Sequence, residues 1–401
     1  MSQKTLQNYV PALTGVRALA AYLVFISHYE YAFDESFPQG VKRFLQEFHF
    51  GVTIFFVLSG FLIAYRYYDN FYLTKDWFKQ YFKNRVARIY PMYFFLTIGA
   101  FIYYYFSGDP QVTAGFKQPF VLLLMNITFL RGFFQDLKFT GIAQGWSLTV
   151  EECFYFSAPF IFLVAKKYNK FYIQPLVLTG LGALLVLIFS HFNWYGFFGS
   201  FTFMMVYTFL GRCFEFFVGI QLALIIHKKG IGRTNNLWYT YIGIVMVFIC
   251  PFIMSRLSIP QGWTAGLHNP WGIVTNNYLL AISIAIFFYG LLTESTILKK
   301  ILSNKFVELL GKSSYIFYLI HLGYMYKYLH EGVNWLNDKV FVWYDKWGVE
   351  WHSPFEYDWL NLIYIFIILN GISILLFKTI EEPLNHYIRK SDFLIKAKKA
   401  D

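Results

Sequence analysis

The stretch PALTGVRALAAYLVFISHYEYAF, residues Pro11–Phe33, places an arginine and a histidine inside an apolar run that is long enough to cross a membrane. An ionisable side chain in hydrocarbon costs about 2.5–3.5 kcal/mol on insertion scales, so such residues face a bundle interior or a wet cavity. Arg17 and His28 are 28 − 17 = 11 residues apart, which is about 16 Å of helical rise and about three turns. The stretch therefore predicts a first span that carries a charge and a titratable ring on one face, at different depths.

The whole chain has the composition of an integral membrane protein. Of its 401 residues, 57% are hydrophobic and 14% are charged, against about 25% charged residues in ordinary globular chains. The formal net charge of +11 is carried in short connections between apolar segments, which is a topology signal and excludes a nucleic-acid-binding interpretation. The three cysteines are scattered in apolar runs, so neither a disulfide framework nor a metal site is predicted.

Apolar segments of spanning length recur from end to end, and they predict one membrane domain, residues 1–401, built as an all-α bundle of about ten transmembrane helices. The predicted spans lie near residues 12–33, 48–68, 89–107, 146–165, 172–191, 203–226, 237–256, 272–293, 306–328 and 359–380. The run Gln118–Leu130 is shorter, and we expect a re-entrant or surface helix there.

The basic connections predict the orientation of the bundle. Lysines and arginines gather at residues 66–88, 166–170, 228–233, 299–305 and 389–399. All of these lie on one side if Gln118–Leu130 does not cross, so the positive-inside rule predicts a multi-pass protein of the cytoplasmic membrane with both termini cytoplasmic. The outer side then carries the aromatic segment Leu329–Asp358, expected as a loop that forms an interfacial belt or a stacking surface for a sugar.

The segment Asp76–Arg88, DWFKQYFKNRVAR, alternates basic and aromatic residues at helical spacing. One interpretation is an amphipathic segment at the cytoplasmic interface. The other is an anion clamp, because Arg85 and Arg88 share a helix face and guanidinium forks bind phosphate well. Arg17 enters the membrane from the same side. Three arginines near one cytoplasmic mouth favour a polyphosphorylated ligand.

Two further segments interrupt apolar spans with small or ionisable residues. In IFFVLSGFLI, Ser59 and Gly60 either permit close helix packing or let a ligand approach the backbone. In LGKSSYIFYLIH, His321 is a second intramembrane histidine, interpreted either as a core residue or as a substrate contact.

The segment GWSLTVEECFY places Trp146, Glu151 and Tyr155 at the start of a span. A carboxylate there is stabilised by the positive end of the helix dipole. Because this helix begins on the same side as His28, Glu151 and His28 also form a plausible pair of general base and orienting group.

These motifs together resemble the acyltransferase-3 family of membrane proteins, which O-acetylate carbohydrates. The resemblance covers nearly the whole chain and rests on Arg17 with His28, IFFVLSGFLI at 54–63, RVARIYP at 85–91, WSLTVEECFY at 146–155, GKSSYIFYLIH at 311–321 and IEEP ending at Pro383. One departure is Thr53, which stands where the family often has an aspartate.

The resemblance implies a membrane O-acyltransferase that moves an acyl group, expected to be acetyl, from cytoplasmic acyl-CoA to a hydroxyl of a cell-surface or lipid-linked saccharide. His28 would act as base or acyl carrier, with Glu151 as its orienting group. The phosphates of the donor would lie at Arg17, Arg85 and Arg88. The expected substrate contacts are Ser59, Trp146, Tyr155 and His321.

The alternative from another class is a multi-span transporter of a small anionic or sugar-like solute, for which intramembrane charges are equally natural. A transporter of this kind predicts inverted halves with matching broken helices. The sequence contains no such pairing that we can identify.

Overall fold

The computed structural model describes residues 10–29, 37–107, 119–192, 194–229, 237–348 and 350–391. Within these ranges the secondary structure is helical, with an isolated β-bridge between Phe134 and Phe197 and no strand. Eight continuous helical segments among the described residues, some of which comprise two or more of the helices named below, are long and apolar enough to cross a membrane. The predicted class, an integral membrane bundle of helices, is therefore confirmed. The two chain ends, whose cytoplasmic placement was predicted, lie outside the described residues.

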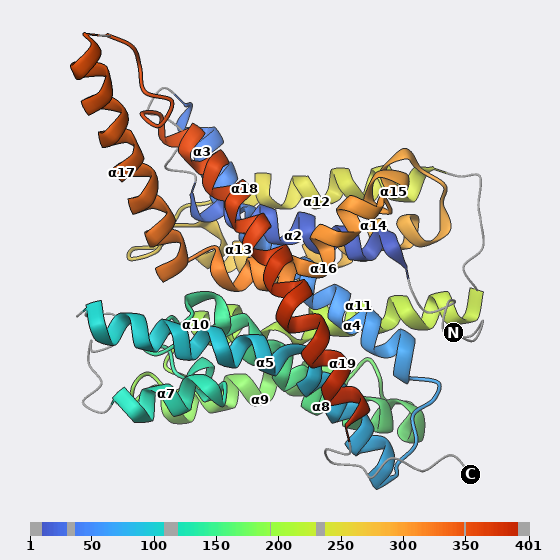
Figure 1. The fold of residues 1–401 in the computed structure, drawn as a ribbon. Coiled ribbons are helices and arrows are strands. Elements are labelled where there is room, and N and C mark those ends of the chain that lie inside the picture. The colour runs from blue at the N-terminus through green and yellow to red at the C-terminus, as the bar shows by residue number, and fades with distance from the viewer. Residues whose placement is uncertain are drawn as a thin grey trace.

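Figure 1 shows how the helices follow one another through the bundle. In chain order they are α2 (Pro11–His28), α3 (Gln39–Gln46), η2 (Glu47–Phe50), α4 (Gly51–Tyr67), α5 (Lys75–Ser107), α7 (Pro119–Ile127), η3 (Leu130–Phe133), η4 (Ala143–Gly145), α8 (Trp146–Tyr168), α9 (Gln174–Phe189), α10 (Phe201–Tyr207), α11 (Phe209–Lys229), α12 (Trp238–Arg256), η5 (Gly266–His268), α13 (Pro270–Val274), η6 (Thr275–Leu279), α14 (Leu280–Thr293), α15 (Ile297–Leu302), α16 (Lys305–Ile320), α17 (Tyr324–Trp347), α18 (Asp358–Leu376), η7 (Phe377–Glu381) and α19 (Glu382–Lys390).

The described helices support eight of the ten predicted spans by length and composition. The other two, near 172–191 and 306–328, coincide with α9 and α16, which have 16 residues each. A helix of that length rises about 24 Å, less than the roughly 30 Å hydrocarbon core, so the count of ten stays a prediction. Helix α7 has nine residues and is too short to cross the membrane, as expected for a re-entrant or surface helix in the run Gln118–Leu130. Gln118 itself lies outside the described residues.

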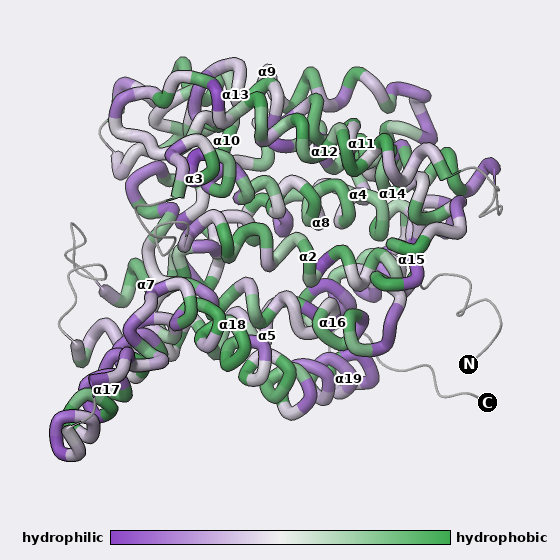
Figure 2. Tube along the Cα trace, turned by 90° about the horizontal axis from the view of Figure 1, so that it is seen from above, coloured by the Kyte–Doolittle hydropathy of each residue, from purple (hydrophilic) through white to green (hydrophobic). Residues whose placement is uncertain are grey.

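The prediction of an aromatic loop over Leu329–Asp358 is wrong for most of its length. Residues Tyr324–Trp347 form the 24-residue helix α17, whose only buried residue is Val333. Figures 1 and 2 both show this helix extending away from the bundle. The segment lacks the continuous hydropathy of a span but keeps a helical spacing of apolar residues, which is typical of an amphipathic helix.

Glycines let the central helices α2, α4, α11 and α16 approach closely. A Cβ atom added to Gly60 of α4 would overlap the carbonyl oxygen of Phe216 in α11, and one added to Gly219 of α11 would overlap that of Val57. Small residues at helix crossings allow this backbone contact inside membranes. The close crossing fixes where the residues next to Gly60 point, and thereby builds the site.

Candidate active site

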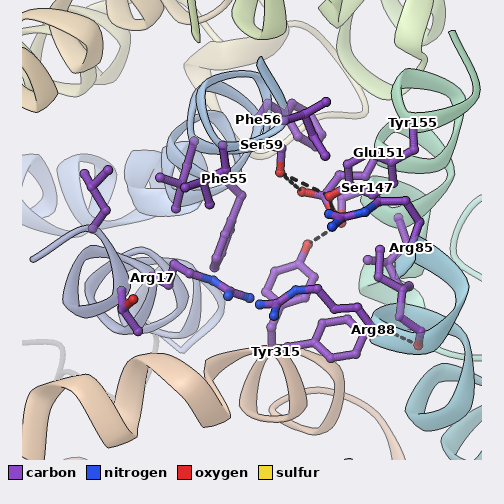
Figure 3. Close-up of a pocket in the computed structure, with 18 of the residues that line it drawn as sticks. Arg17, Phe55, Phe56, Ser59, Arg85, Arg88, Ser147, Glu151, Tyr155 and Tyr315 are labelled. Atoms are coloured by element: carbon purple, nitrogen blue, oxygen red, sulfur yellow. Dashed lines mark hydrogen bonds between the residues drawn. The ribbon is translucent and has the colours of Figure 1, made fainter. Parts of the chain in front are cut away.

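Five arginines line a cavity beside the first half of α2, which we call the arginine cavity (Figure 3). Its empty volume is about 1370 Å³, part of which is open to solvent. The five are Arg17 of α2, Arg66 of α4, Arg85 and Arg88 of α5, and Arg389 of α19. The structure thus brings together the three arginines predicted from the sequence. It adds two further arginines. Arg66 directly follows the segment LSGFLIAY, and Arg389 was predicted only as one of the basic residues near the C-terminus.

The arginine cavity holds positive charge that the protein does not neutralise at close range. Among the described residues, none of the five guanidinium groups has a carboxylate oxygen within 4 Å. The Nε atoms of Arg85 and Arg389 are buried without a hydrogen-bond partner. In Figure 3, Arg17 and Arg88 extend toward each other. Converging guanidinium groups with unused donors are suited to a polyanion, phosphate above all.

Three other predicted residues meet in the wall of the same cavity. Ser59 Oγ donates a hydrogen bond to Glu151 Oε1 at 2.7 Å, and Tyr155 donates to Glu151 Oε2 at 3.4 Å. The Arg85 guanidinium lies 5.6 Å from the centroid of the Tyr155 ring, within cation–π range. Ser59 therefore faces the cavity, while its neighbour Gly60 packs against α11 as the close-packing interpretation expected. The approach of a ligand to this pair stays a prediction.

A second cavity, the histidine cavity, lies beside the last turn of α2 and has an empty volume of about 1440 Å³, again partly open. It is lined by three histidines, His28, His49 and His268, with Trp146 among its aromatic residues. The residues that the two cavities share are Val52 and Tyr318. The two cavities thus follow one another along α2 and adjoin at these side chains.

The hydrogen bonds of His28 fix which ring nitrogen carries its proton. His28 Nδ1 lies 2.8 Å from the carbonyl oxygen of Val24. A carbonyl only accepts, so Nδ1 is the donor and Nε2 keeps a free lone pair. His321 is fully buried, donates from Nδ1 to the Tyr318 carbonyl at 2.8 Å, and places Nε2 3.4 Å from His28 Nδ1. His321 therefore contacts the Nδ1 edge of the His28 ring and helps to hold the ring in this orientation.

The structure does not bring Glu151 against His28. Glu151 lines the arginine cavity and is bonded to Ser59 and Tyr155 there, whereas His28 lines the histidine cavity and is bonded to the Val24 carbonyl. Glu152, the next residue along α8, lines neither cavity.

An aromatic group in the histidine cavity escaped the sequence analysis. The ring of Trp263 is stacked on His268 with centroids 3.8 Å apart, and Tyr207 donates to His268 Nε2 at 3.0 Å. Burial lowers the pKa of His268 to about 4, so the ring is neutral at physiological pH and accepts this bond. Trp146 meets Tyr207 edge to face, with centroids 4.9 Å apart. Residues 261–268, QGWTAGLH, offered only an isolated tryptophan and histidine in a connection as a signal.

Thr53, which stands where the family often has an aspartate, forms a hydrogen bond with a buried arginine. Arg212 of α11 donates to Thr53 Oγ1 at 3.0 Å and to Glu215 Oε1 at 2.8 Å. The neutral threonine leaves the charge of Arg212 to be balanced by Glu215, three residues along the same helix. A buried guanidinium needs such a partner, because an unpaired charge there is strongly destabilising.

Fold and site together define a multi-span helical membrane protein with two adjoining cavities inside its bundle, one rich in arginine and one in histidine. The family follows from the sequence comparison: a family model described as an acyltransferase domain, Acyl_transf_3, matches residues 10–376. The chain therefore belongs to the acyltransferase-3 family.

Among characterised proteins, the chain is similar to the O-acetyltransferase OatA of Staphylococcus aureus (strain NCTC 8325 / PS 47), with 26% identity over 327 residues, or 78% of this chain and 50% of that protein. It is 28% identical over 180 residues to the peptidoglycan O-acetyltransferase OatA of Listeria monocytogenes, covering 41% of this chain and 26% of that protein. The acyltransferase MdmB of Streptomyces mycarofaciens is 26% identical over 169 residues, covering 39% and 40%. The chain spans about half the length of the S. aureus relative. Among solved structures, none matches the chain.

Proposed function

We propose that this protein transfers an acetyl group from cytoplasmic acetyl-CoA to a hydroxyl group of a cell-surface or lipid-linked saccharide. Family membership and relatives named as O-acetyltransferases support the reaction class. The observation that carries the proposal is that an arginine cavity and a histidine cavity adjoin at Val52 and Tyr318. A donor and an acceptor can then enter from opposite ends and meet between them.

The arginine cavity is the proposed donor site. Coenzyme A carries several phosphate groups, and the guanidinium groups of Arg17, Arg85 and Arg88 face one cavity without carboxylate partners within 4 Å among the described residues. The positive-inside rule puts this end of the bundle in the cytoplasm. From Arg17 to His28 the helix rises about 16 Å, which is comparable to the reach of a pantetheine arm.

His28 is the proposed general base. Its Nε2 lone pair takes the proton of the acceptor hydroxyl, and the oxygen attacks the carbonyl carbon of the thioester. The new C–O bond forms, the C–S bond breaks, and coenzyme A leaves as a thiolate that takes up the proton held by His28, which returns the ring to its neutral form. His321 holds the ring through the 3.4 Å contact at Nδ1.

Glu151 has a different proposed role from the one that its sequence position indicated. Through Ser59 and Tyr155, at 2.7 and 3.4 Å, it holds two hydroxyl groups in the wall of the arginine cavity. In this position it is a positioning residue for the donor arm, and the orientation of His28 falls to Val24 and His321. The acceptor would lie in the histidine cavity, where Trp146 and Tyr207 present aromatic surface.

The proposal is tested by measuring ester-linked acetate on the surface saccharides of the host cell with and without this protein. Complementation with the wild-type chain should restore the acetate, and His28→Ala should not, although it is inserted to the same level. His191→Ala, at an exposed position outside both cavities, is the matched control and should restore it. An acetate content that does not depend on the protein, or full activity of His28→Ala, would overturn the proposal.

A further inference from the structure

The histidine cavity carries positive charge without a compensating acid in its wall. Among the described residues that line it are the two cations Lys138 and Arg212, and neither aspartate nor glutamate. Arg212 is neutralised by Glu215 at 2.8 Å. Lys138 remains, with Nζ donating to the Gln135 carbonyl at 2.8 Å and lying 5.3 Å from the Tyr207 ring centroid. The nearby carboxylate of Asp136 interacts with Lys138 electrostatically, but it is exposed, does not line the cavity and forms no ion pair with Lys138 within 4 Å. One half-buried ammonium group thus faces the cavity with donors to spare.

Two buried polar atoms in the same wall lack partners, and both are hydrogen-bond acceptors. His49 donates from Nδ1 to the Gln46 carbonyl at 2.8 Å, which leaves Nε2 as an acceptor. This atom is buried without a hydrogen bond, and the Glu47 carboxylate nearest to it lies 3.9 Å away, beyond hydrogen-bond distance. Gln144 donates from Nε2 to the Leu319 carbonyl at 3.0 Å, and its Oε1 is likewise unpartnered. A buried acceptor left unsatisfied costs about 1–3 kcal/mol. Hydroxyl groups of a bound ligand would satisfy both atoms.

The aromatic part of the cavity wall, formed by Tyr207, Trp263 and His268, is held in place by hydrogen bonds within the protein. Glu47, the first residue of η2, accepts hydrogen bonds from the backbone amides of Gly266 and Leu267, at 2.5 and 3.3 Å, and so ties the connection before α13 to η2. This connection carries Trp263 and His268, whose rings are stacked. A preformed wall lowers the ordering cost of binding.

We propose that the histidine cavity binds a saccharide unit that carries a carboxylate, with Lys138 pairing with the carboxylate while His49 Nε2 and Gln144 Oε1 accept hydrogen bonds from two sugar hydroxyls. This inference rests on the proposed function, of which it names the acceptor class. A lysine is a single point charge and suits a monovalent carboxylate, whereas phosphate is better bound by arginine forks, which gather in the other cavity.

The test is to measure the Kd values of three glycosides that differ only at carbon 6 of the sugar: p-nitrophenyl β-glucuronide, p-nitrophenyl β-glucoside and its 6-phosphate. Titration calorimetry of the purified full chain in detergent at low ionic strength should give a glucuronide Kd about five- to tenfold below that of the glucoside, with the 6-phosphate no tighter than the glucuronide. Lys138→Met should abolish the preference for glucuronide. Lys346→Met removes an exposed lysine of α17 outside both cavities and should keep it.

A second variant tests the hydroxyl contacts independently of the charge. His49→Phe should weaken the binding of glucuronide and glucoside by a similar factor, about fivefold, and leave the Kd of acetyl-CoA unchanged. Equal affinity for glucuronide and glucoside in the wild type, tightest binding of the 6-phosphate, or a preference that survives Lys138→Met would each overturn the inference.

The failure of this inference is distinguishable from failure of the proposed function. Acetyl-CoA is titrated against the same preparations, and its binding should depend on the arginine cavity alone. Glucuronide binding that follows the expected pattern without any acetyl-CoA binding would contradict the proposed donor and leave the acceptor inference standing. Acetyl-CoA binding without the glucuronide preference would contradict only the acceptor inference.

Discussion

Replacing Arg88 by lysine removes a planar fork from the arginine cavity and keeps a positive charge. Arg88 has no carboxylate within 4 Å among the described residues. The buried Glu381 interacts with Arg88 electrostatically over a longer distance, and a lysine keeps the positive charge that faces it. The expected effect is the loss of one charge-assisted hydrogen bond to a phosphate. Hydrogen bonds to charged groups contribute about 1.5–3 kcal/mol, and about 1.4 kcal/mol is a factor of ten. The Kd of acetyl-CoA should therefore rise about tenfold.

The assay is titration calorimetry of acetyl-CoA against the purified full chain in detergent, repeated at two ionic strengths. Arg256→Lys is the matched control, because Arg256 ends α12 at an exposed position outside both cavities. Its affinity for acetyl-CoA should equal that of the wild type. The reasoning is refuted if Arg88→Lys leaves the acetyl-CoA Kd unchanged, or if it weakens saccharide binding and spares the donor.

Three further outcomes are expected. Glu151→Gln should lower kcat by roughly 10²-fold, because the hydroxyl groups of Ser59 and Tyr155 that Glu151 holds would be displaced and the donor arm would be misplaced. Glu152→Gln should stay active, and an active first variant with an inactive second would mean that the cavity-facing side of α8 has been misassigned. Gly60→Leu should lower the melting temperature of the detergent-solubilised protein by several degrees, because the side chain has no room at the α4–α11 crossing. Gly180→Leu should not lower it, since nothing lies within 4 Å of a Cβ added there. Equal melting temperatures for the two variants would contradict the close crossing. Burial lowers the pKa of His268 to about 4, from its ordinary value of 6.5, so its contribution to stability is present above pH 6.5 and is lost as the pH falls toward 4. In the plot of melting temperature against pH, His268→Phe should therefore have a smaller slope between pH 4 and 6.5 than the wild type. An unchanged slope would contradict this prediction.

The fold class was predictable because hydropathy over about 20 residues reports directly on burial in a bilayer. The same signal misses helices that are amphipathic, and α17 was accordingly expected as a loop. Helices α9 and α16 have 16 residues each, and a helix of that length is too close to the minimum for a span for length alone to decide whether it crosses the membrane.

The arginine cavity was predictable in part, since Arg85 and Arg88 share a face of one helix and local spacing reports such pairs. Residues joined only by tertiary packing were not. The bond from Ser59 to Glu151 spans 92 positions in sequence, and depth along two separate helices wrongly suggested that Glu151 reaches His28. The wall formed by Tyr207, Trp263 and His268 has no local pattern that predicts it, because Tyr207 and the connection that carries Trp263 and His268 are far apart in the chain.

The central claim is that donor and acceptor enter from opposite sides of the membrane. Proteoliposomes test it directly, with acetyl-CoA sealed inside and a soluble fraction of host surface saccharides outside, compared with both substrates outside. The account predicts ester-linked acetate on the saccharides only in the first arrangement. With both substrates outside, no transfer is expected from protein molecules inserted in either orientation, because the two cavities open to opposite sides in each. Equal transfer with both substrates outside would contradict it.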